Sequence, residues 1–260
     1  METLIPAALG ILFGLLGLLW GADRFVAGSA GAAKNFGVSP LVIGLTIVSI
    51  GTSAPEIIVA INAALKDAGD MAVGNAIGSN LANIGLVLGI TAIICPIPTQ
   101  SHLIKQEGPV LLAVTLLAGF FIFDGMLLRP EGIALACIIP PLLALTVYYK
   151  KRHPNPETVE EGEAIPSIST TAALLWFIVG LGALLISSEA LVWGAKQFAL
   201  FFGVSQLVIG LTIVAVGTSL PELAASVMSA IRGHHDIALG NIFGSNPVSY
   251  THLTLPTITE

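Results

Sequence analysis

A block of twenty residues occurs twice in this chain and limits the folds that the chain can adopt. Residues 37–56, from Gly-Val-Ser-Pro-Leu-Val to Gly-Thr-Ser-Ala-Pro-Glu, match residues 203–222 at 16 of 20 positions without a gap. The same offset of 166 places the Gly-Asn-x-x-Gly-Ser-Asn motif at 74–80 onto the one at 240–246. The chain therefore contains two copies of one unit.

The composition places this duplicated unit in a membrane. Hydrophobic residues make up 55% of the chain and charged residues 10%, whereas an average soluble domain has about 25% charged residues. A spanning helix needs about 20 apolar residues. The chain has seven segments of this kind, and an eighth begins near Ile237. We expect an all-α polytopic membrane protein that contacts the lipid bilayer and binds no nucleic acid. Seven segments lack Asp, Glu, Lys and Arg: 3–22, 35–55, 71–104, 108–123, 132–149, 164–188 and 197–221.

The two repeats are predicted to have inverted orientations. Five spans precede the polar segment around 150–168, so the second copy enters the membrane from the opposite side. Inverted repeats are typical of secondary transporters, which bind their substrate near the midplane where the halves meet. We expect the protein to lie in the cell membrane. The positive-inside rule predicts that its N-terminus is outside the cytoplasm. One side would carry Arg24, Lys34, Lys105, Lys150, Lys151, Arg152 and Arg232, and the other Lys66, Arg129 and Lys196.

These features divide the chain into four parts. Residues 1–149 form the first repeat with helices 1–5, and its repeated core is at about 37–90. Residues 150–168 form a cytoplasmic linker. Residues 169–246 form a partial second repeat with helices 6–8, and its core starts at 203. Residues 247–260 have no helical periodicity and resemble translated sequencing-adaptor read-through, so we interpret them as a non-native tail; a divergent C-terminus is the alternative.

Each copy of the block ends in a sequence that interrupts a helix. Pro55 has no N–H, so the carbonyl of Gly51 loses its helical partner, and the residue before a proline is pushed away from the α region. We expect a break, with Thr52 or Ser53 capping the half-helix that follows and Pro55 in its first turn. Such a break is tolerated at membrane depth only where it lines a cavity or lies against protein.

An acid follows the break in each half. Glu56 and Glu222 lie within membrane segments, where an ionisable residue indicates a functional site by default. Inversion brings the two carboxylates together, and they repel each other unless a cation lies between them. Carboxylate, hydroxyl and carbonyl oxygens suit Ca²⁺ or Na⁺ better than Mg²⁺ or a thiophilic metal. We expect these two ions to be transported substrates, and we expect no cofactor.

The second motif supplies small and polar residues to the next span. Its glycines permit close helix approach, and its polar side chains in lipid must face a partner or a cavity. Ser79 and Asn83 are four residues apart on one helix face, so we expect them to line the site. Asn75 and Asn80 fit either site lining or helix packing. Asp23 and Glu189, which also match at the offset of 166, fit interfacial charges near helix ends or a gating role.

Both motifs, each present twice, resemble the α-repeats of the calcium/cation antiporter superfamily, and in particular prokaryotic sodium/calcium exchangers. The resemblance covers residues 1–246. It implies two inverted five-helix halves, of which the second is incomplete here, with ions enclosed by the second, third, seventh and eighth helices. It also implies that the counterpart of Asn83 is Ser249, so that this ligand is lost. The implied ion ligands are Glu56, Glu222, Thr52, Ser53, Thr218, Ser219, Ser79, Asn83 and Ser245, with backbone oxygens of Ser49 and Ala215.

The resemblance implies a secondary transporter that exchanges Ca²⁺ for Na⁺ by alternating access. The two glutamates would bind either one Ca²⁺ or several Na⁺. A Ca²⁺/H⁺ antiporter is the first alternative, because the same carboxylates can carry protons. A non-transporting truncated fragment is the second, because the ninth and tenth helices are missing. An enzyme is not expected, because the sequence contains no nucleophile–base pairing or phosphate loop.

Overall fold

The computed structural model describes residues 4–66, 69–98, 105, 107–124, 128–152 and 168–252. The regular elements in these ranges are all helices, which confirms the all-α prediction. The first repeat contains α1 (Leu4–Phe36), α2 (Pro40–Ile43), η1 (Gly44–Val48), α3 (Ser49–Thr52), α4 (Ala54–Leu65), α5 (Gly69–Ala82), η2 (Asn83–Leu88), α6 (Gly89–Ile94), α7 (Gly108–Phe121) and α8 (Arg129–Arg152). The second contains α9 (Thr170–Phe201), α10 (Gln206–Ile209), η5 (Gly210–Val214), α11 (Ala215–Thr218), α12 (Leu220–Ile231) and α13 (His235–His252).

The duplication in the sequence is repeated in the backbone. The bounds of α2, η1, α3 and α4 recur in α10, η5, α11 and α12 at the offset of 166. The turns that precede them also match, because Gly37 has φ 63° and Gly203 has φ 76°. Glycine adopts this left-handed conformation without a Cβ penalty. After each turn, the N–H of Val38 and of Val204 donates to a carbonyl five residues earlier, as at a Schellman helix end.

Helices of membrane-spanning length carry the fold. Within the described ranges, three helices are long and apolar enough to cross a bilayer, and two bent helix pairs pass the same test; the three are α1, α9 and the run Met71–Ile94. The predicted ends of the first and sixth spans, at residues 22 and 188, are wrong. Both helices continue by more than ten residues, so Asp23 and Glu189 lie inside α1 and α9 rather than near their ends. A span defined by the absence of acidic and basic residues ends at the first acid, whereas the helix continues past it.

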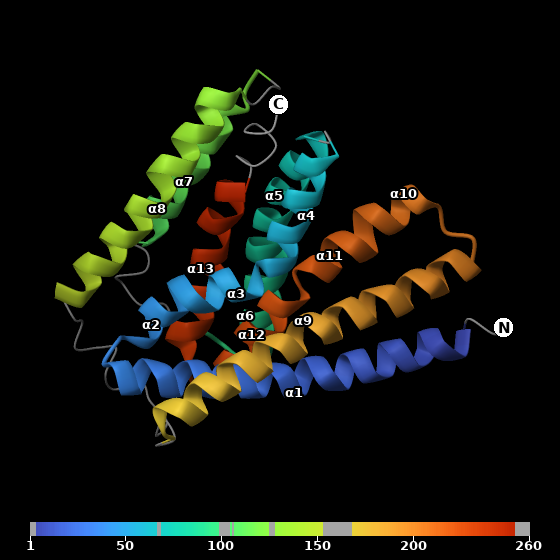
Figure 1. Ribbon diagram of the computed structural model, residues 1–260, viewed down its shortest axis with the longest axis horizontal. Coiled ribbons are helices and arrows are strands. Elements are labelled where there is room, and N and C mark those ends of the chain that lie inside the picture. The colour runs from blue at the N-terminus through green and yellow to red at the C-terminus, as the bar shows by residue number, and fades with distance from the viewer. Residues whose placement is uncertain are drawn as a thin grey trace.

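The long helices α1 and α9 lie side by side, and small residues bring them together (Figure 1). A Cβ built at Gly14 would lie 2.9 Å from the backbone N of Leu191, and one at Gly21 would lie 2.9 Å from the backbone N of Leu184. Glycine is therefore required at these crossings, as is common between helices in membranes. The helix α13 lies among α2, η1, α3, α5 and α12 and so connects the second repeat to the first.

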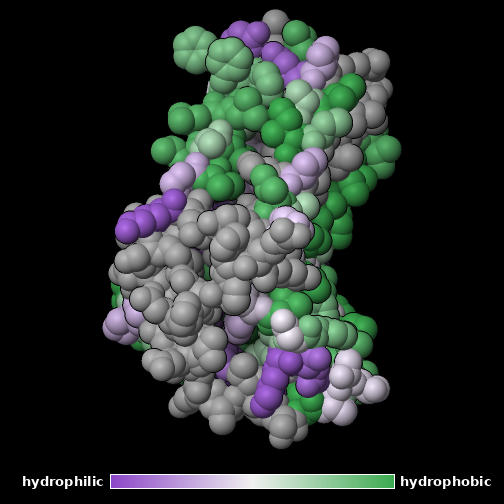
Figure 2. Space-filling view, turned by 90° about the vertical axis from the view of Figure 1, so that its left-hand side faces the viewer, coloured by the Kyte–Doolittle hydropathy of each residue, from purple (hydrophilic) through white to green (hydrophobic). Residues whose placement is uncertain are grey.

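The surface of the described residues is strongly apolar. Figure 2 shows hydrophobic side chains over large parts of one face, with hydrophilic residues only in small groups. Large apolar side chains such as Phe13, Phe120 and Ile178 are 64%, 75% and 65% exposed. Soluble proteins rarely expose contiguous apolar patches of this kind. The chain is thus a multi-pass membrane protein with its apolar surface toward lipid.

The end of the second repeat is more helical than its sequence indicated. Residues 247–252 lack helical periodicity, yet α13 runs through Pro247 to His252. Residues 253–260 lie outside the described residues, as do residues 153–167, which form most of the predicted linker.

Candidate ion-binding site

Each repeat bends at the same residue of the repeated block. The helices before and after the bend meet at 47° in the first half and 49° in the second. The residue at the bend is Ser53, with φ −79° and ψ 10°, and Ser219, with φ −88° and ψ 4°. These angles lie toward the bridge region rather than in an α-helix. The breaks predicted from Pro55 and Pro221 are therefore confirmed.

The hydroxyls at the first break do not cap the helix that follows, so that prediction is wrong. Ser53 Oγ donates to Glu222 Oε1 at 2.8 Å, and Thr52 Oγ1 donates to Asn241 Oδ1 at 3.0 Å. Both acceptors belong to the second repeat. Ser219, the counterpart of Ser53, makes no side-chain cap bond to α12. The break thus directs its hydroxyl groups toward the opposite half of the molecule.

A π-helical turn precedes each break, which the sequence pattern alone did not predict. These turns are η1 and η5, at matching positions of the two repeats. Hydroxyl side chains bond back along η1: Thr46 Oγ1 donates to the carbonyl of Val42 at 2.6 Å, and Ser49 Oγ donates to that of Leu45 at 2.9 Å. Back-bonding of this kind bends helices, and π turns are frequent at functional sites. In the sequence, the hydroxyl residues Thr46 and Ser49 were the available signal for the π-helical turn η1.

The two glutamates lie buried in the first turn of the helix after each break. Glu56 is the third residue of α4 and is 2% exposed, and Glu222 is the third residue of α12 and is 1% exposed. The N-terminal end of a helix favours a negative charge. Within the described part of the chain, neither carboxylate forms an ion pair with a basic side chain. No basic side chain of the described residues therefore balances either carboxylate.

Several predicted ligands present buried oxygen atoms without a hydrogen-bond partner among the described residues. Leaving a buried polar group unsatisfied costs about 1–3 kcal/mol, so a group of such atoms needs an explanation. All of them are oxygens, the ligand type that Ca²⁺ takes in flexible geometry, and they come from both repeats. The donor set therefore fits a hard cation. The atoms are Glu56 Oε2, Asn83 Oδ1, Ser219 Oγ, Glu222 Oε2 and Ser245 Oγ.

The structure buries most of the predicted ligands and leaves two of them near the surface. Thr218 is half-buried and Ala215 is exposed, and Thr218 Oγ1 donates to the Ala215 carbonyl at 3.2 Å. The first-half counterparts make the same bond, from Thr52 Oγ1 to the Ser49 carbonyl at 3.3 Å, but are buried. The ligand assignments stay predictions. The buried set is Ser49, Thr52, Ser53, Glu56, Ser79, Asn83, Ser219, Glu222 and Ser245.

Asparagines of the second motif hold the glutamate-bearing helices in place. Asn75 Nδ2 donates to the carbonyl of Glu56, and Asn241 Nδ2 donates to the carbonyl of Glu222, each at 3.3 Å. Asn241 also donates to Ser226 Oγ at 3.0 Å. From the sequence, Asn75 fitted either site lining or helix packing, and the roles of Asn241 and Ser226 were overlooked. The equal spacing of asparagine and glutamate in both repeats was the signal.

Ser249 takes the position that corresponds to Asn83. It is buried, and its Oγ donates to the carbonyl of Ser245 at 3.0 Å within α13. The hydroxyl proton is thus engaged by the helix itself. No amide oxygen occupies this place in the second repeat, so the two halves do not offer identical ligands.

Comparisons with known proteins agree with this architecture. The family described as sodium/calcium exchanger protein matches residues 6–145 and 172–255. The candidate antiporter CaxA of Alkalimonas amylolytica is 48% identical over 246 residues, covering 94% of this chain and 77% of CaxA. The sodium/calcium exchanger MaX1 of Methanosarcina acetivorans is 34% identical over 272 residues, covering 91% of this chain and 78% of MaX1.

A solved structure supports the same relationship. The sodium-calcium exchanger NCX_Mj, soaked with Na⁺ and Ca²⁺, is similar to this chain with a TM-score of 0.83 and 37% identity. The match covers 97% of this chain and 82% of that one. Two inverted repeats, two broken helices and unpartnered buried oxygens in both repeats are thus accompanied by similarity along nearly the whole sequence. The chain belongs to the sodium/calcium exchanger family of membrane antiporters.

Proposed function

We propose that the chain exchanges Ca²⁺ for Na⁺ across the cell membrane, with both ions using one site between Glu56 and Glu222. The observation that supports this most is the group of unpartnered buried oxygens that both repeats contribute. Two carboxylates neutralise one Ca²⁺ or two Na⁺, and shared ligands prevent both kinds of ion from binding at once. This competition couples the two ion fluxes.

Differences in packing between the repeats support alternating access. A Cβ at Gly44 would lie 2.7 Å from the Ile237 carbonyl and 2.9 Å from Gly240 Cα, so η1 packs tightly on α13. Gly74, the counterpart of Gly240, has no such neighbour within 4 Å of a built Cβ. One route to the glutamates is therefore tightly packed and its symmetry-related route is loosely packed. Exchanging these two arrangements between the repeats would move access to the other face.

The orientation follows from the basic residues. With the N-terminus outside the cytoplasm, α2 and the start of α13 lie at the cytoplasmic end. The tightly packed face is then the cytoplasmic one, and the conformation is accessible from outside.

The proposal is tested with the purified chain in liposomes that hold a Na⁺ gradient. We expect Na⁺-driven uptake of radioactive Ca²⁺, and we expect Glu56→Gln and Glu222→Gln each to abolish it, because each removes a charged ligand. Glu131→Gln is the matched control. Glu131 also lies in the first turn of a helix, α8, and accepts a bond from the Leu128 N–H at 2.8 Å, which a glutamine oxygen can retain.

Ca²⁺ binding by the purified protein gives a second readout. Failure of the unaltered chain both to exchange and to bind Ca²⁺ would contradict the proposal, and so would full activity of the glutamine variants. A pH gradient in place of the Na⁺ gradient separates the proton-coupled alternative. Ca²⁺ uptake driven by the pH gradient alone would replace Na⁺ with H⁺ as the coupling ion.

A further inference from the structure

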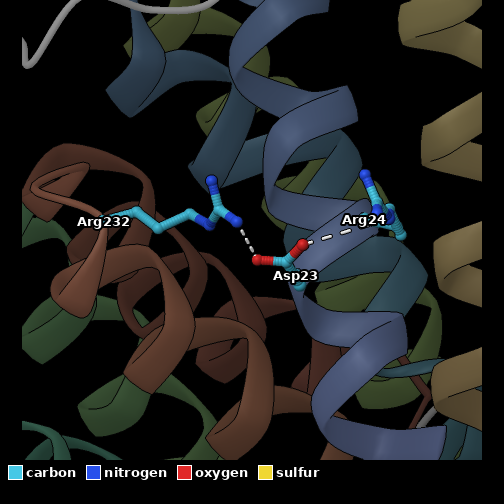
Figure 3. Close-up of polar contacts among 3 residues, drawn as sticks. All are labelled: Asp23, Arg24 and Arg232. Carbon is cyan, nitrogen blue, oxygen red and sulfur yellow. Dashed lines mark hydrogen bonds and ion pairs between the residues drawn. The ribbon is translucent and has the colours of Figure 1, made fainter.

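A charged pair joins the two repeats outside the candidate ion-binding site. Asp23 lies inside α1 of the first repeat, and its carboxylate accepts a hydrogen bond from the guanidinium of Arg232, which follows α12 of the second repeat (Figure 3). Arg24 Nε lies 4.0 Å from the other carboxylate oxygen. The side chains of Asp23 and Arg232 are 24% and 41% exposed. The pair is therefore partly exposed at the surface of the described residues.

The internal symmetry assigns this pair a counterpart. The offset of 166 that maps Asp23 onto Glu189 also maps Lys66 onto Arg232. Lys66 directly follows α4, as Arg232 directly follows α12, and Glu189 lies inside α9 as Asp23 lies inside α1. An acid in the long helix and a base after the broken helix are thus present in both repeats.

The counterpart charges are apart in this conformation. Glu189 and Lys66 are both exposed, and neither has an opposite charge within ion-pair distance among the described residues. The helices that carry them differ in the same way. Helix α1 packs along α12, whereas the symmetry-related helices α9 and α4 share no comparable contact within the described ranges. The Asp23–Arg232 pair forms where α1 packs on α12. Its counterpart, Glu189 and Lys66, is separated where α9 and α4 lack that packing.

We propose that Asp23–Arg232 and Glu189–Lys66 are two ionic latches that close alternately during transport. This inference rests on the alternating access proposed above. The first latch holds α1 against the end of α12 in the present conformation. When the repeats exchange their arrangements, that latch opens and Glu189 on α9 meets Lys66 at the end of α4. Each latch joins one repeat to the other, so it reports and stabilises closure of one face only.

The exposure of the charges fits this role. Partly exposed ion pairs shift an equilibrium by a factor of about two to five, and not by orders of magnitude. A latch that must open in every cycle needs this modest strength. A stronger, fully buried pair would hold one conformation and stop exchange.

Cysteine cross-linking tests the predicted meeting of the second pair. In a chain with Cys95→Ala and Cys137→Ala, Glu189→Cys together with Lys66→Cys is treated with a bifunctional methanethiosulfonate cross-linker in the presence of Na⁺ and Ca²⁺, because an ion pair of two long side chains holds the backbones too far apart for a direct disulfide. We expect a cross-link that stops exchange and is reversed by reductant. Asp23→Cys with Arg232→Cys should behave likewise. Glu189→Cys with Arg232→Cys, which combines residues of different latches, should not cross-link.

Charge reversal tests whether the second pair acts by attraction. Lys66→Glu should slow Ca²⁺ exchange by about twofold to fivefold, and adding Glu189→Lys should restore the rate. Two solvated surface charges would give no loss and no rescue. Two results would overturn the latch. One is that the cysteine-free background exchanges Ca²⁺ normally while the Lys66→Cys, Glu189→Cys double variant never cross-links. The other is that Glu189→Lys fails to restore the exchange rate of Lys66→Glu. Loss of exchange in the background itself, with intact Ca²⁺ binding by the unaltered chain, would instead overturn the proposed transport.

Discussion

The two repeats carry nearly the same block of sequence but place it in different surroundings. Val48 in η1 is 1% exposed, whereas its counterpart Val214 in η5 is 37% exposed. Ser53 reaches Glu222 of the other half, whereas Ser219 has no hydrogen-bond partner among the described residues. The backbone at both breaks is nevertheless alike. Local sequence therefore determines the shape of each broken helix, while the packing of the repeats determines what that helix contacts.

The largest expected difference between the halves comes from the glycines of the second motif. A Cβ at Gly244 would lie 2.5 Å from the Leu45 carbonyl and 2.6 Å from Ser49 Oγ, whereas one at Gly78 meets nothing within 4 Å. Gly244→Ala should lower the free energy of unfolding by about 3 kcal/mol through overpacking, and Gly78→Ala should change it little. Thermal unfolding in detergent measures both. Equal losses would mean that the two faces are packed alike.

A smaller difference is expected at the serines of the breaks. Ser53→Ala removes the bond to Glu222 and should cost about 1.5 kcal/mol in the ion-free protein, because hydrogen bonds to charged groups are worth at least that much. Ser219→Ala removes no bond in this conformation and should leave the unfolding temperature unchanged. Urea or thermal unfolding without Na⁺ and Ca²⁺ checks the pair. A larger loss for Ser219→Ala would reverse our assignment of the packed half.

The smallest effect concerns a contact that only one half possesses. The guanidinium carbon of Arg24 lies 4.6 Å from the ring centre of Trp176, between α1 and α9. The corresponding positions of the other repeat are Ala190 and Gly10, which offer neither charge nor ring. A double-mutant cycle of Arg24→Gln and Trp176→Leu should give a coupling of about 0.5–1 kcal/mol. Strict additivity of the two changes would exclude a cation–π contribution.

The same contrast explains what the sequence could predict. The helix breaks follow from local chemistry, because Pro55 and Pro221 act on the turn that contains them. The inversion of the repeats follows from the odd number of spans before the second copy. The tight and loose packing of the two faces could not be predicted, because both copies carry the same residues there. The π turns were also missed, although the hydroxyls of Thr46 and Ser49 that bond back along the helix were visible in the sequence.

Long-range partners account for the other errors. The sequence did not show that Asp23, inside α1, has a partner in Arg232, 209 residues away. The capping role expected of Thr52 and Ser53 failed for a related reason, since both hydroxyls have acceptors in the second repeat. A single sequence shows which groups need partners but not which distant residues supply them.

The burial of Glu56 and Glu222 without a basic partner among the described residues would also limit leakage in the proposed exchange. An ionised group is expensive to hold in a low-dielectric interior without a counter-charge. An empty carrier of this kind would have to enclose two negative charges without a cation when its access changes from one side of the membrane to the other. That step is slow compared with the same step after a cation has neutralised the pair. Under the exchange proposed above, the electrostatics of the unloaded protein thus disfavour slippage and make each inward step conditional on an outward one.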